Sequence, residues 1–363
     1  MLSLFLFQIS LNRMIKTLSA TNYSIEIGPL TESSFQDLLT NKYANSRKVI
    51  MVDENTHDNC LEFLLTAFDD LTDAEVILLP AGEENKVMEV CFQVWNALSD
   101  YGIGRNDLVI NLGGGVVTDM GGFIAAVYKR GVDFVNIPTS LLGMVDASIG
   151  GKTGIDLGAF KNQLGVFKDP VGIFIDPSFL HSLPENEVWN GFAEILKHAL
   201  IADSSLWAKI KNYRNIDDLY TADLIEAGIS IKLKTVLNDP FEKGERKLLN
   251  FGHTIGHALE GFMLETDSPV SHGHAVAIGV LLESKLSTNR GVLSQMEFTQ
   301  IEETIEALYA PIELDEEQKE IVLELMKNDK KNSEGKIKGI LIHSIGHCTF
   351  DEVYEEEEIR NVL

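Results

Sequence analysis

Basic residues are scarce in this 363-residue chain, because 30 Lys and Arg stand against 55 Asp and Glu and leave a formal net charge of −25. A surface of this sign repels phosphate backbones and anionic lipids, so we expect neither nucleic acid nor membrane as a partner. An anionic substrate would need a local cluster of cations that acts against the overall field of the protein.

Cysteine is also scarce. Cys60, Cys91 and Cys348 are scattered, with no C-x-x-C spacing. This pattern argues against a disulfide framework and against a thiolate metal site, and it is typical of a reducing compartment. We therefore expect a cytoplasmic protein.

An apolar run at residues 1–11 is too short to span a bilayer. No basic residue precedes it and no clear small-residue cleavage site follows it, which disfavours a secretion signal, although that interpretation stays open. We expect residues 1–16 to be a dispensable extension, with Met14 as a possible true start.

The length of the chain favours two domains. Strand-like apolar runs in the first half lie at 49–52, 76–79, 108–112, 134–137 and 173–175, with helical patterns between them near 58–69, 86–101 and 116–130. This alternation predicts a mostly parallel sheet with helices on both faces. After Pro184 the pattern is helical, over 187–202, 204–212, 221–237, 246–264, 273–288, 297–309 and 315–328, with one possible strand at 337–342. We predict an α/β domain over 17–183 and an all-α domain over 184–363.

A glycine-rich turn follows the run at 108–112, which leads into Gly113-Gly114-Gly115 and then into a helical pattern. Such a turn can bind phosphate, because glycines let backbone N–H groups approach an anion that the helix dipole favours. The spacing matches neither G-x-G-x-x-G nor the Walker A motif, so a tight packing turn is the alternative. Asp119, one turn into the helix, could form a hydrogen bond with a ribose or nicotinamide, or its negative charge could merely interact favourably with the helix dipole.

A second glycine cluster, Gly150-Gly151-Lys152-Thr153-Gly154, is accompanied by Lys161 and, upstream, by Arg130. The three cations near exposed glycine backbone favour an anion site. A surface loop with ordinary lysines is the alternative.

Histidines are concentrated in the second half, where four of the nine stand in one short stretch: His253, His257, His272 and His274. A helix over 246–264 would place Arg246, Asn250, His253 and His257 within about 60° of one another. That face could hold a metal and an anion together; a solvated polar face is the alternative, although Lys and Glu usually dominate such faces. Both His253 and His257 could bind a metal, or His257 could be free for acid–base chemistry.

A carboxylate partner for the histidines is available on the helix predicted over 187–202. Glu194, Lys197 and His198 share one face of that helix, at i, i+3 and i+4. Glu with two His and an open position is a catalytic zinc set. A Glu194–Lys197 surface ion pair is the alternative.

The segments that carry these residues resemble the 3-dehydroquinate synthases, a family of sugar-phosphate cyclases. The matching strings lie within residues 111–279 and read GGGVVTDMGGFIAAVYKRG, PTSLLGMVDASIGGKTGID, KNQLGVF, NGFAEILKHALI, ERKLLNFGHTIGH and SHGHAVAIG. Weaker support comes from DEN at 53–55, GEENK at 82–86 and DKK at 329–331. Several motifs in the right order make the resemblance specific.

The resemblance implies an NAD-binding α/β domain over 17–183 and a helical metal- and substrate-binding domain over 184–363. The implied ligands of a Zn²⁺ or Co²⁺ ion are Glu194, His253 and His272. The implied NAD-binding residues are Asp53, Asn55, Glu83, Lys86, Gly114, Gly115, Asp119, Thr139, Ser140, Lys161 and Asn190. The implied substrate-binding residues are Arg130, Asp146, Lys152, Asn162, Lys197, Lys232, Arg246, Asn250 and one of Lys330 and Lys331. Glu242 and His257 match the acid–base positions.

The reaction that the resemblance implies converts 3-deoxy-D-arabino-heptulosonate 7-phosphate into 3-dehydroquinate and phosphate, in the shikimate pathway of aromatic amino acid biosynthesis. NAD⁺ takes a hydride from C5, phosphate is eliminated, the hydride is returned and the ring closes as a carbocycle. We therefore expect a small anionic sugar phosphate as the partner, and a homodimer.

Three alternatives remain: another sugar-phosphate cyclase, a metal-dependent NAD alcohol dehydrogenase of similar fold, and a catalytically silent binding protein. The phosphate-directed cations speak against the dehydrogenase, and the presence of Glu242 and His257 speaks against a silent relative.

Two departures from the family pattern touch the surroundings of the implied site. His272-Gly273-His274 stands where the family usually has His-Gly-Glu, and Asp239-Pro240 stands where it usually has Asp-Glu.

Overall fold

The computed structural model describes residues 15–158, 160–327 and 336–363. The chain divides into two compact units on either side of the Ser182–Leu183 bond. We call 15–182 the N-terminal unit and 183–363 the C-terminal unit. Most of the predicted extension over 1–16, together with Lys330 and Lys331, lies outside the described residues.

A seven-stranded sheet forms the N-terminal unit, in the order β1-β2-β9-β6-β5-β3-β4. Its strands are β1 (Lys16–Ser19), β2 (Ser24–Ile27), β3 (Lys48–Asp53), β4 (Glu75–Leu79), β5 (Leu108–Gly113), β6 (Asp133–Pro138) and β9 (Gly172–Ile175). Every neighbouring pair is parallel except β1–β2. The predicted mostly parallel sheet is confirmed. The pattern missed β1 and β2 because both are four residues long and β1 buries no side chain fully.

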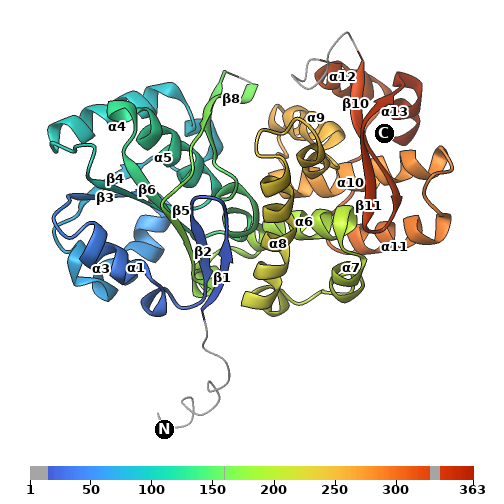
Figure 1. The fold of residues 1–363 in the computed structure, drawn as a ribbon. Coiled ribbons are helices and arrows are strands. Elements are labelled where there is room, and N and C mark those ends of the chain that lie inside the picture. The colour runs from blue at the N-terminus through green and yellow to red at the C-terminus, as the bar shows by residue number, and fades with distance from the viewer. Residues whose placement is uncertain (1–14, 159, 328–335) are drawn as a thin grey trace, which may run out of the picture. The chain divides into compact units, whose positions relative to one another are not determined.

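Helices cover both faces of this sheet (Figure 1). They are α1 (Phe35–Asp37), α2 (Glu54–Thr56), α3 (Glu62–Ala67), α4 (Met88–Asp100) and α5 (Gly115–Val127). One face is packed by α4 and α5, whose Leu98 and Ile124 join Val49 and Val109 of the strands in a common core. The helix predicted to reach residue 130 ends at Val127, because Tyr128 leaves helical geometry with a ψ of 126° and Lys129 and Arg130 are left-handed.

A two-stranded hairpin occupies the region of the second glycine cluster. It consists of β7 (Lys152–Leu157) and β8 (Phe160–Phe167), which pair antiparallel. A Cβ on Gly154 would lie 2.7 Å from the Leu164 carbonyl oxygen across the hairpin, so glycine is required by the close approach of the two backbones. The alternative of a surface loop at 150–154 is therefore wrong from Lys152 onward, because these residues belong to β7.

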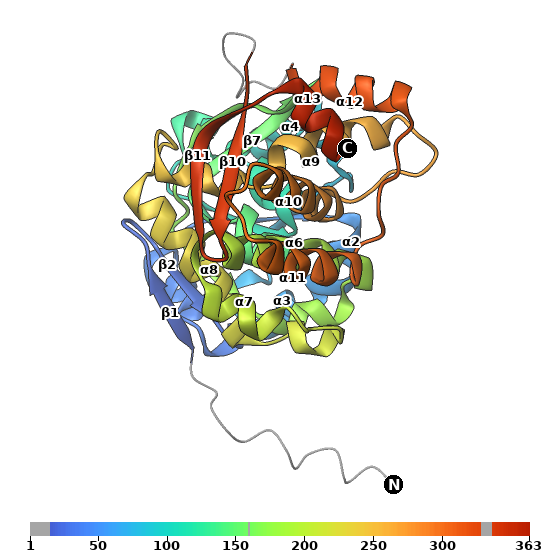
Figure 2. The same cartoon turned by 90° about the vertical axis from the view of Figure 1, so that its right-hand side faces the viewer.

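The C-terminal unit is helical, with one added hairpin. Its helices are α6 (Glu185–Ala202), α7 (Ser204–Ile210), α8 (Ala222–Asn238), α9 (His253–Leu264), α10 (His272–Asn289), α11 (Gln295–Glu306), α12 (Glu316–Lys327) and α13 (Glu356–Val362). The possible strand at 337–342 is confirmed as β10 (Ile337–Ser344), and it pairs with β11 (His347–Tyr354), which the pattern missed. The unit is therefore mostly helical, as predicted, but not entirely α. Figure 2 shows α10 near the centre of the unit, and it contacts α6, α9, α11 and β10. Among the described residues, no helix combines the length and apolar character that a bilayer crossing requires.

The helices α9 and α10 cross at backbone contact. A Cβ on Gly279 would overlap the carbonyl oxygen of Gly252, and one on Gly256 would lie 2.9 Å from the Ala275 carbonyl oxygen. The missing side chains therefore let the two helices that carry His253, His257 and His272 approach each other closely.

The single helix predicted over 246–264 is wrong. A 3₁₀ helix covers Glu245–Asn250, Phe251 leaves helical geometry, and Gly252 adopts a left-handed φ of 79° before α9 begins at His253. The shared helical face proposed for Arg246, Asn250, His253 and His257 therefore does not exist, because the backbone changes direction between the two pairs.

Gly279→Ala should destabilise the fold by roughly 1–3 kcal/mol, because the added methyl group overlaps the backbone of α9. Gly261→Ala in α9 is the matched control: its nearest atom would lie 3.9 Å away, and alanine should stabilise the helix by about 0.5–1 kcal/mol. Urea titration measures both free energies of unfolding, and an unchanged Gly279→Ala value would contradict the close crossing.

Candidate active site

In the N-terminal unit, the carboxyl ends of three neighbouring strands carry predicted nucleotide-binding residues. β3 ends at Asp53, β5 at Gly113 and β6 at Pro138, directly before Thr139 and Ser140. β4 lies on one side of β3 and β5 on the other, so the chain reverses its direction across the sheet at this place. In open α/β sheets, ligands bind at such a switch point, outside the carboxyl ends of the strands.

The glycine turn joins β5 to α5 at this edge. Gly114 caps α5 and Gly115 begins it. A Cβ on Gly114 would lie 3.1 Å from the Ser140 hydroxyl, and one on Gly115 would lie 3.2 Å from the Ala147 Cβ. The first N–H groups of a helix have no acceptor within it, so this crowded, glycine-lined helix start suits an anion.

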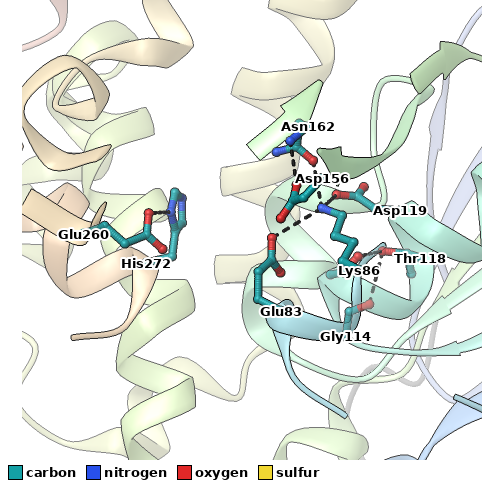
Figure 3. A network of polar contacts seen from close by, with 10 residues as sticks. Glu83, Lys86, Gly114, Thr118, Asp119, Asp156, Asn162, Glu260 and His272 are labelled. Carbon is teal, nitrogen blue, oxygen red and sulfur yellow. Dashed lines mark hydrogen bonds and ion pairs between the residues drawn. The ribbon is translucent and has the colours of Figure 1, made fainter. Parts of the chain in front are cut away.

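Lys86 stands at the centre of a polar network in the same unit (Figure 3). It is 2% exposed, and its Nζ lies 2.8 Å from Asp119 Oδ2, 2.8 Å from Asn162 Oδ1 and 3.6 Å from Glu83 Oε1. Burial alone would lower the pKa of Lys86, but Asp119 and Glu83 outweigh burial and hold it above its usual range. Lys86 therefore stays charged. It links Asn162, which is predicted to bind the substrate, to residues that are predicted to bind the cofactor.

Asp156 joins this network, although the sequence did not single it out. Its Oδ1 accepts the N–H of Asn162 at 2.6 Å, and Asn162 has a left-handed φ of 50°. Burial raises the pKa of Asp156, while Lys86 and the Asn162 N–H act in the opposite direction. Asp156 therefore fixes the backbone that presents Asn162 to Lys86.

Other predicted residues of this unit have the following places. Asp53 caps α2 by accepting the Thr56 N–H at 2.8 Å, and Asn55 is exposed on α2. Asp146 is half-buried in the segment Gly143–Ala147. On the hairpin, Lys152 of β7 is exposed and Lys161 of β8 is half-buried.

Arg130 has a left-handed φ of 67° and lines an open hollow of about 500 Å³ with Lys129 and Arg105. Three cations there form a local positive patch in an acidic protein.

In the C-terminal unit, a buried carboxylate meets two histidines. Glu194 of α6 is 0% exposed, and its Oε1 lies 3.6 Å from His253 Nε2 and 3.8 Å from His272 Nε2. Its other oxygen pairs with Lys197 Nζ, which is 1% exposed. The alternative of a surface ion pair is therefore wrong, because both partners lie inside the unit.

The two histidines hold their second ring nitrogens against acceptors. His253 Nδ1 lies 3.2 Å from the Phe251 carbonyl oxygen, and His272 Nδ1 lies 3.2 Å from Glu260 Oε2, as Figure 3 shows for the latter pair. This arrangement turns both Nε2 atoms toward Glu194 and is the usual support of histidine metal ligands. One carboxylate and two imidazoles fit Zn²⁺ or Co²⁺ with an open position.

His257 lies beside this pair. Ring nitrogens of His253, His257 and His272 come within 4.8 Å of one another, so three histidines are a second possible ligand set. The Glu194 set has additional support, because His253 and His272 both direct Nε2 toward the same buried carboxylate oxygen.

The remaining candidates of this unit surround the 3₁₀ helix at 245–250. Arg246 is 1% exposed and donates from Nη1 to the Pro240 carbonyl oxygen at 2.6 Å. Asn250 donates to Glu242 Oε1 at 2.6 Å, and Glu242 has a left-handed φ of 57°. Strained backbone of this kind is frequent at functional sites. Lys232 is also buried, on α8.

Two residues at the start of α10 have different surroundings. His274 Nε2 lies 2.7 Å from the Ala310 carbonyl oxygen, and its ring contacts Tyr309. The N–H of Gly273 donates to Asn190 Oδ1, whose amide in turn donates to Glu187 Oε2 at 2.9 Å. Asn190, which is predicted to bind NAD, thus connects the start of α10 to α6.

Sequence reasoning missed Glu260 and Asp156. Glu260 could have been found, because it follows His253 by seven residues and His257 by three and so shares their helix face. Asp156 could not, because its role depends on a hairpin that the pattern did not predict.

Comparison with known proteins finds relatives of one family over both units. Residues 76–190 match the family model described as 3-dehydroquinate synthase N-terminal, and residues 191–332 match the one described as 3-dehydroquinate synthase C-terminal. The 3-dehydroquinate synthase of Parabacteroides distasonis is 38% identical over 338 residues, which cover 92% of this chain and 94% of the relative. That of Thermoanaerobacter pseudethanolicus is 40% identical over 295 residues, which cover 80% and 82%.

Solved structures with the same fold include related cyclases and dehydrogenases. A 2-epi-5-epi-valiolone synthase of Streptomyces hygroscopicus, with NAD⁺ and Zn²⁺ bound, superposes with a TM-score of 0.83 at 28% identity, over 96% of this chain and 98% of its own. The NADH-dependent butanol dehydrogenase A of Thermotoga maritima superposes with a TM-score of 0.65 at 15% identity, over 95% and 96%, which shows the fold alone. The matches over both units and the identity to curated relatives show that this chain belongs to the 3-dehydroquinate synthase family.

Proposed function

We propose that this protein is a 3-dehydroquinate synthase, a carbon–oxygen lyase that converts 3-deoxy-D-arabino-heptulosonate 7-phosphate into 3-dehydroquinate and phosphate. The observation that carries the proposal is the buried Glu194 carboxylate, which faces the Nε2 atoms of His253 and His272 in a chain of this family. The same chain has a glycine turn at a sheet switch point, as a nucleotide requires.

NAD⁺ and a divalent metal, Zn²⁺ or Co²⁺, are the cofactors of the proposed reaction. When bound, NAD⁺ would accept a hydride from C5 of the substrate and return it, while the metal would polarise the oxygen on that carbon. Glu194, His253 and His272 would hold the metal. The turn at Gly114 and Gly115 would receive the pyrophosphate.

Asp53, Asn55, Glu83, Lys86, Asp119, Thr139, Ser140, Lys161 and Asn190 complete the proposed NAD site. The charged network around Lys86 supports this role, because a buried ammonium held by Asp119 and Asn162 cannot reorient freely. Residues of such a network orient a ligand without rearrangement during turnover.

The substrate carries a carboxylate and a phosphate, so its recognition needs cations and amides. We assign this task to Arg130, Asp146, Lys152, Asn162, Lys197, Lys232, Arg246, Asn250 and one of Lys330 and Lys331. The burial of Lys197, Lys232 and Arg246 supports the assignment, because buried cations in an acidic protein strengthen charge-assisted hydrogen bonds to an anion.

Proton transfers are assigned to Glu242 and His257. His257 lies beside His253 and His272, with ring centroids 5.0 and 5.7 Å away. Glu242 is held by Asn250, which itself belongs to the proposed substrate group. A homodimer and residence in the cytoplasm remain our predictions for this enzyme.

Redox balance distinguishes the synthase from a dehydrogenase of the same fold. A hydride taken from C5 returns within one turnover, so NAD⁺ should be needed only in catalytic amount and no NADH should accumulate. Enzyme, the heptulosonate phosphate and excess NAD⁺ are mixed, and phosphate release and the NADH absorbance band are followed over many turnovers. NADH that rises one-for-one with substrate consumed would identify a dehydrogenase.

His272→Ala should abolish stoichiometric zinc binding, because His272 Nε2 lies 3.8 Å from the Glu194 carboxylate. His274→Ala is the matched control, two residues along the same helix, and should keep most of its zinc because its Nε2 contacts the Ala310 carbonyl oxygen. Atomic absorption after gel filtration measures the zinc content. Equal loss in both variants would show that the ligand assignment is wrong.

Lys152→Ala should weaken substrate binding by about 10–100-fold, since a charge-assisted contact to an anion contributes about 1.5–3 kcal/mol. NAD⁺ affinity should change little. Lys168→Ala replaces an exposed lysine directly after the same hairpin; it is the control and should leave both affinities intact.

Arg246→Ala should weaken substrate binding in the same way as Lys152→Ala, and its folding must be checked because Arg246 is buried. If calorimetry showed that NAD⁺ affinity falls as much as substrate affinity, these residues would belong to the cofactor site instead.

A further inference from the structure

A second buried carboxylate in the C-terminal unit has no part in the assignments above. Glu283 lies on α10 and is 0% exposed. Its Oε2 accepts the N–H of Gly252 at 3.0 Å, and its Oε1 accepts the N–H of Ile255 at 3.3 Å. Both carboxylate oxygens therefore bind backbone groups at the start of α9.

The other side of this carboxylate contacts the β10–β11 hairpin. The Tyr354 hydroxyl lies 3.2 Å from Glu283 Oε2 and 2.6 Å from the Ile340 carbonyl oxygen, and it accepts the Ile340 N–H at 2.8 Å. Burial and the neighbouring Glu283 raise the pKa of Tyr354, so its hydroxyl keeps its proton. Glu283 thus connects three elements, α9, α10 and the hairpin, which lie side by side in Figure 2.

A buried carboxylate is expensive unless its charge is compensated. Here the compensation comes from the positive end of the α9 dipole and from two N–H groups that have no acceptor within the helix. An apolar residue at position 283 would leave those N–H groups buried and unpaired. The carboxylate therefore sets the geometry of the turn that it caps.

The capped turn is the one that carries a proposed metal ligand. Gly252 and Ile255 flank His253, the first residue of α9. His253 directs Nε2 toward Glu194 Oε1, and its Nδ1 lies 3.2 Å from the carbonyl oxygen of Phe251, within the same turn. Movement of this turn would displace both contacts of the imidazole together.

We propose that Glu283 is a positioning residue for the metal site: it holds the first turn of α9 so that His253 presents Nε2 beside Glu194. This proposal rests on the proposed function, because it takes His253 as a metal ligand. Glu283 does not touch the metal or the substrate in this role, and acts through the Gly252 and Ile255 backbone.

The test uses the full chain loaded with Zn²⁺ or Co²⁺. Glu283→Gln keeps the shape of the side chain, but it removes the charge and places an amide N–H₂ against one of the two backbone donors. Zinc affinity, measured by chelator competition, should fall by about 10–100-fold, as for other residues that orient metal ligands. The visible d–d absorption of the Co²⁺ form should change in intensity and position, since one imidazole is displaced.

Ser287→Ala is the matched control. Ser287 is also 0% exposed on α10. Its hydroxyl donates to the Glu283 backbone carbonyl oxygen at 2.9 Å and accepts the Ile342 N–H of β10 at 3.2 Å, so the variant loses two buried hydrogen bonds but keeps the Glu283 carboxylate and its contacts with the turn at Gly252. It should lose stability but keep its zinc affinity and its cobalt spectrum. Equal effects of the two variants on zinc would show that Glu283 acts only through general stability, and would overturn the proposal.

A Glu283→Gln variant that folds with wild-type zinc affinity and an unchanged cobalt spectrum would also overturn the proposal. If that variant does not fold, Tyr354→Phe replaces it: the carboxylate stays, one of its partners is lost, and the cobalt spectrum should still change. An unchanged spectrum in folded Tyr354→Phe would then overturn the proposal. Failure of the wild-type chain to bind either metal would instead overturn the proposed function, and with it the reason to position His253.

Discussion

The C-terminal unit depends on how it compensates the charge of Glu194. A carboxylate with no solvent contact, in the middle of the buried helix α6, is costly unless opposite charges and donors surround it. Lys197 pairs with one of its oxygens, and His253 and His272 approach the other. These histidines come from two other helices, so the helices must converge on one point, and the glycine contacts between α9 and α10 permit that convergence.

The nucleotide site proposed for the N-terminal unit would use a different physical route. Its glycine turn would use the backbone, since a Cβ at Gly114 or Gly115 would lie only 3.1 or 3.2 Å from Ser140 or Ala147. Around it, the charged network of Lys86, Asp119 and Asn162 is organised by short hydrogen bonds inside the unit. Backbone donors suit a pyrophosphate, whereas buried side chains suit a metal, and the proposed function assigns these two tasks to different units.

Much of the fold could be predicted from periodicity, because β3 to β6 and the helices of the C-terminal unit bury one face or all of their surface. The failures have identifiable causes. The β7–β8 hairpin and β11 were missed, because β7 and β11 alternate only partly between buried and exposed side chains and the apolar pattern is therefore weak there. The break at Gly252 was missed because a glycine inside a helical pattern does not reveal that a residue far along the chain, Glu283, caps the next helix.

The sequence by itself determined the family, the parallel sheet and the residue types of the candidate site, since these follow from local pattern and from motif order. Only the tertiary structure decided which groups meet. His272 and His274 are two residues apart, which turns them by about 200° around the helix axis. One therefore faces Glu194 and Glu260, and the other packs on Tyr309 and Ala310. The contacts of a side chain on a helix depend on which segment packs against that face, and only the tertiary structure brings such distant segments together.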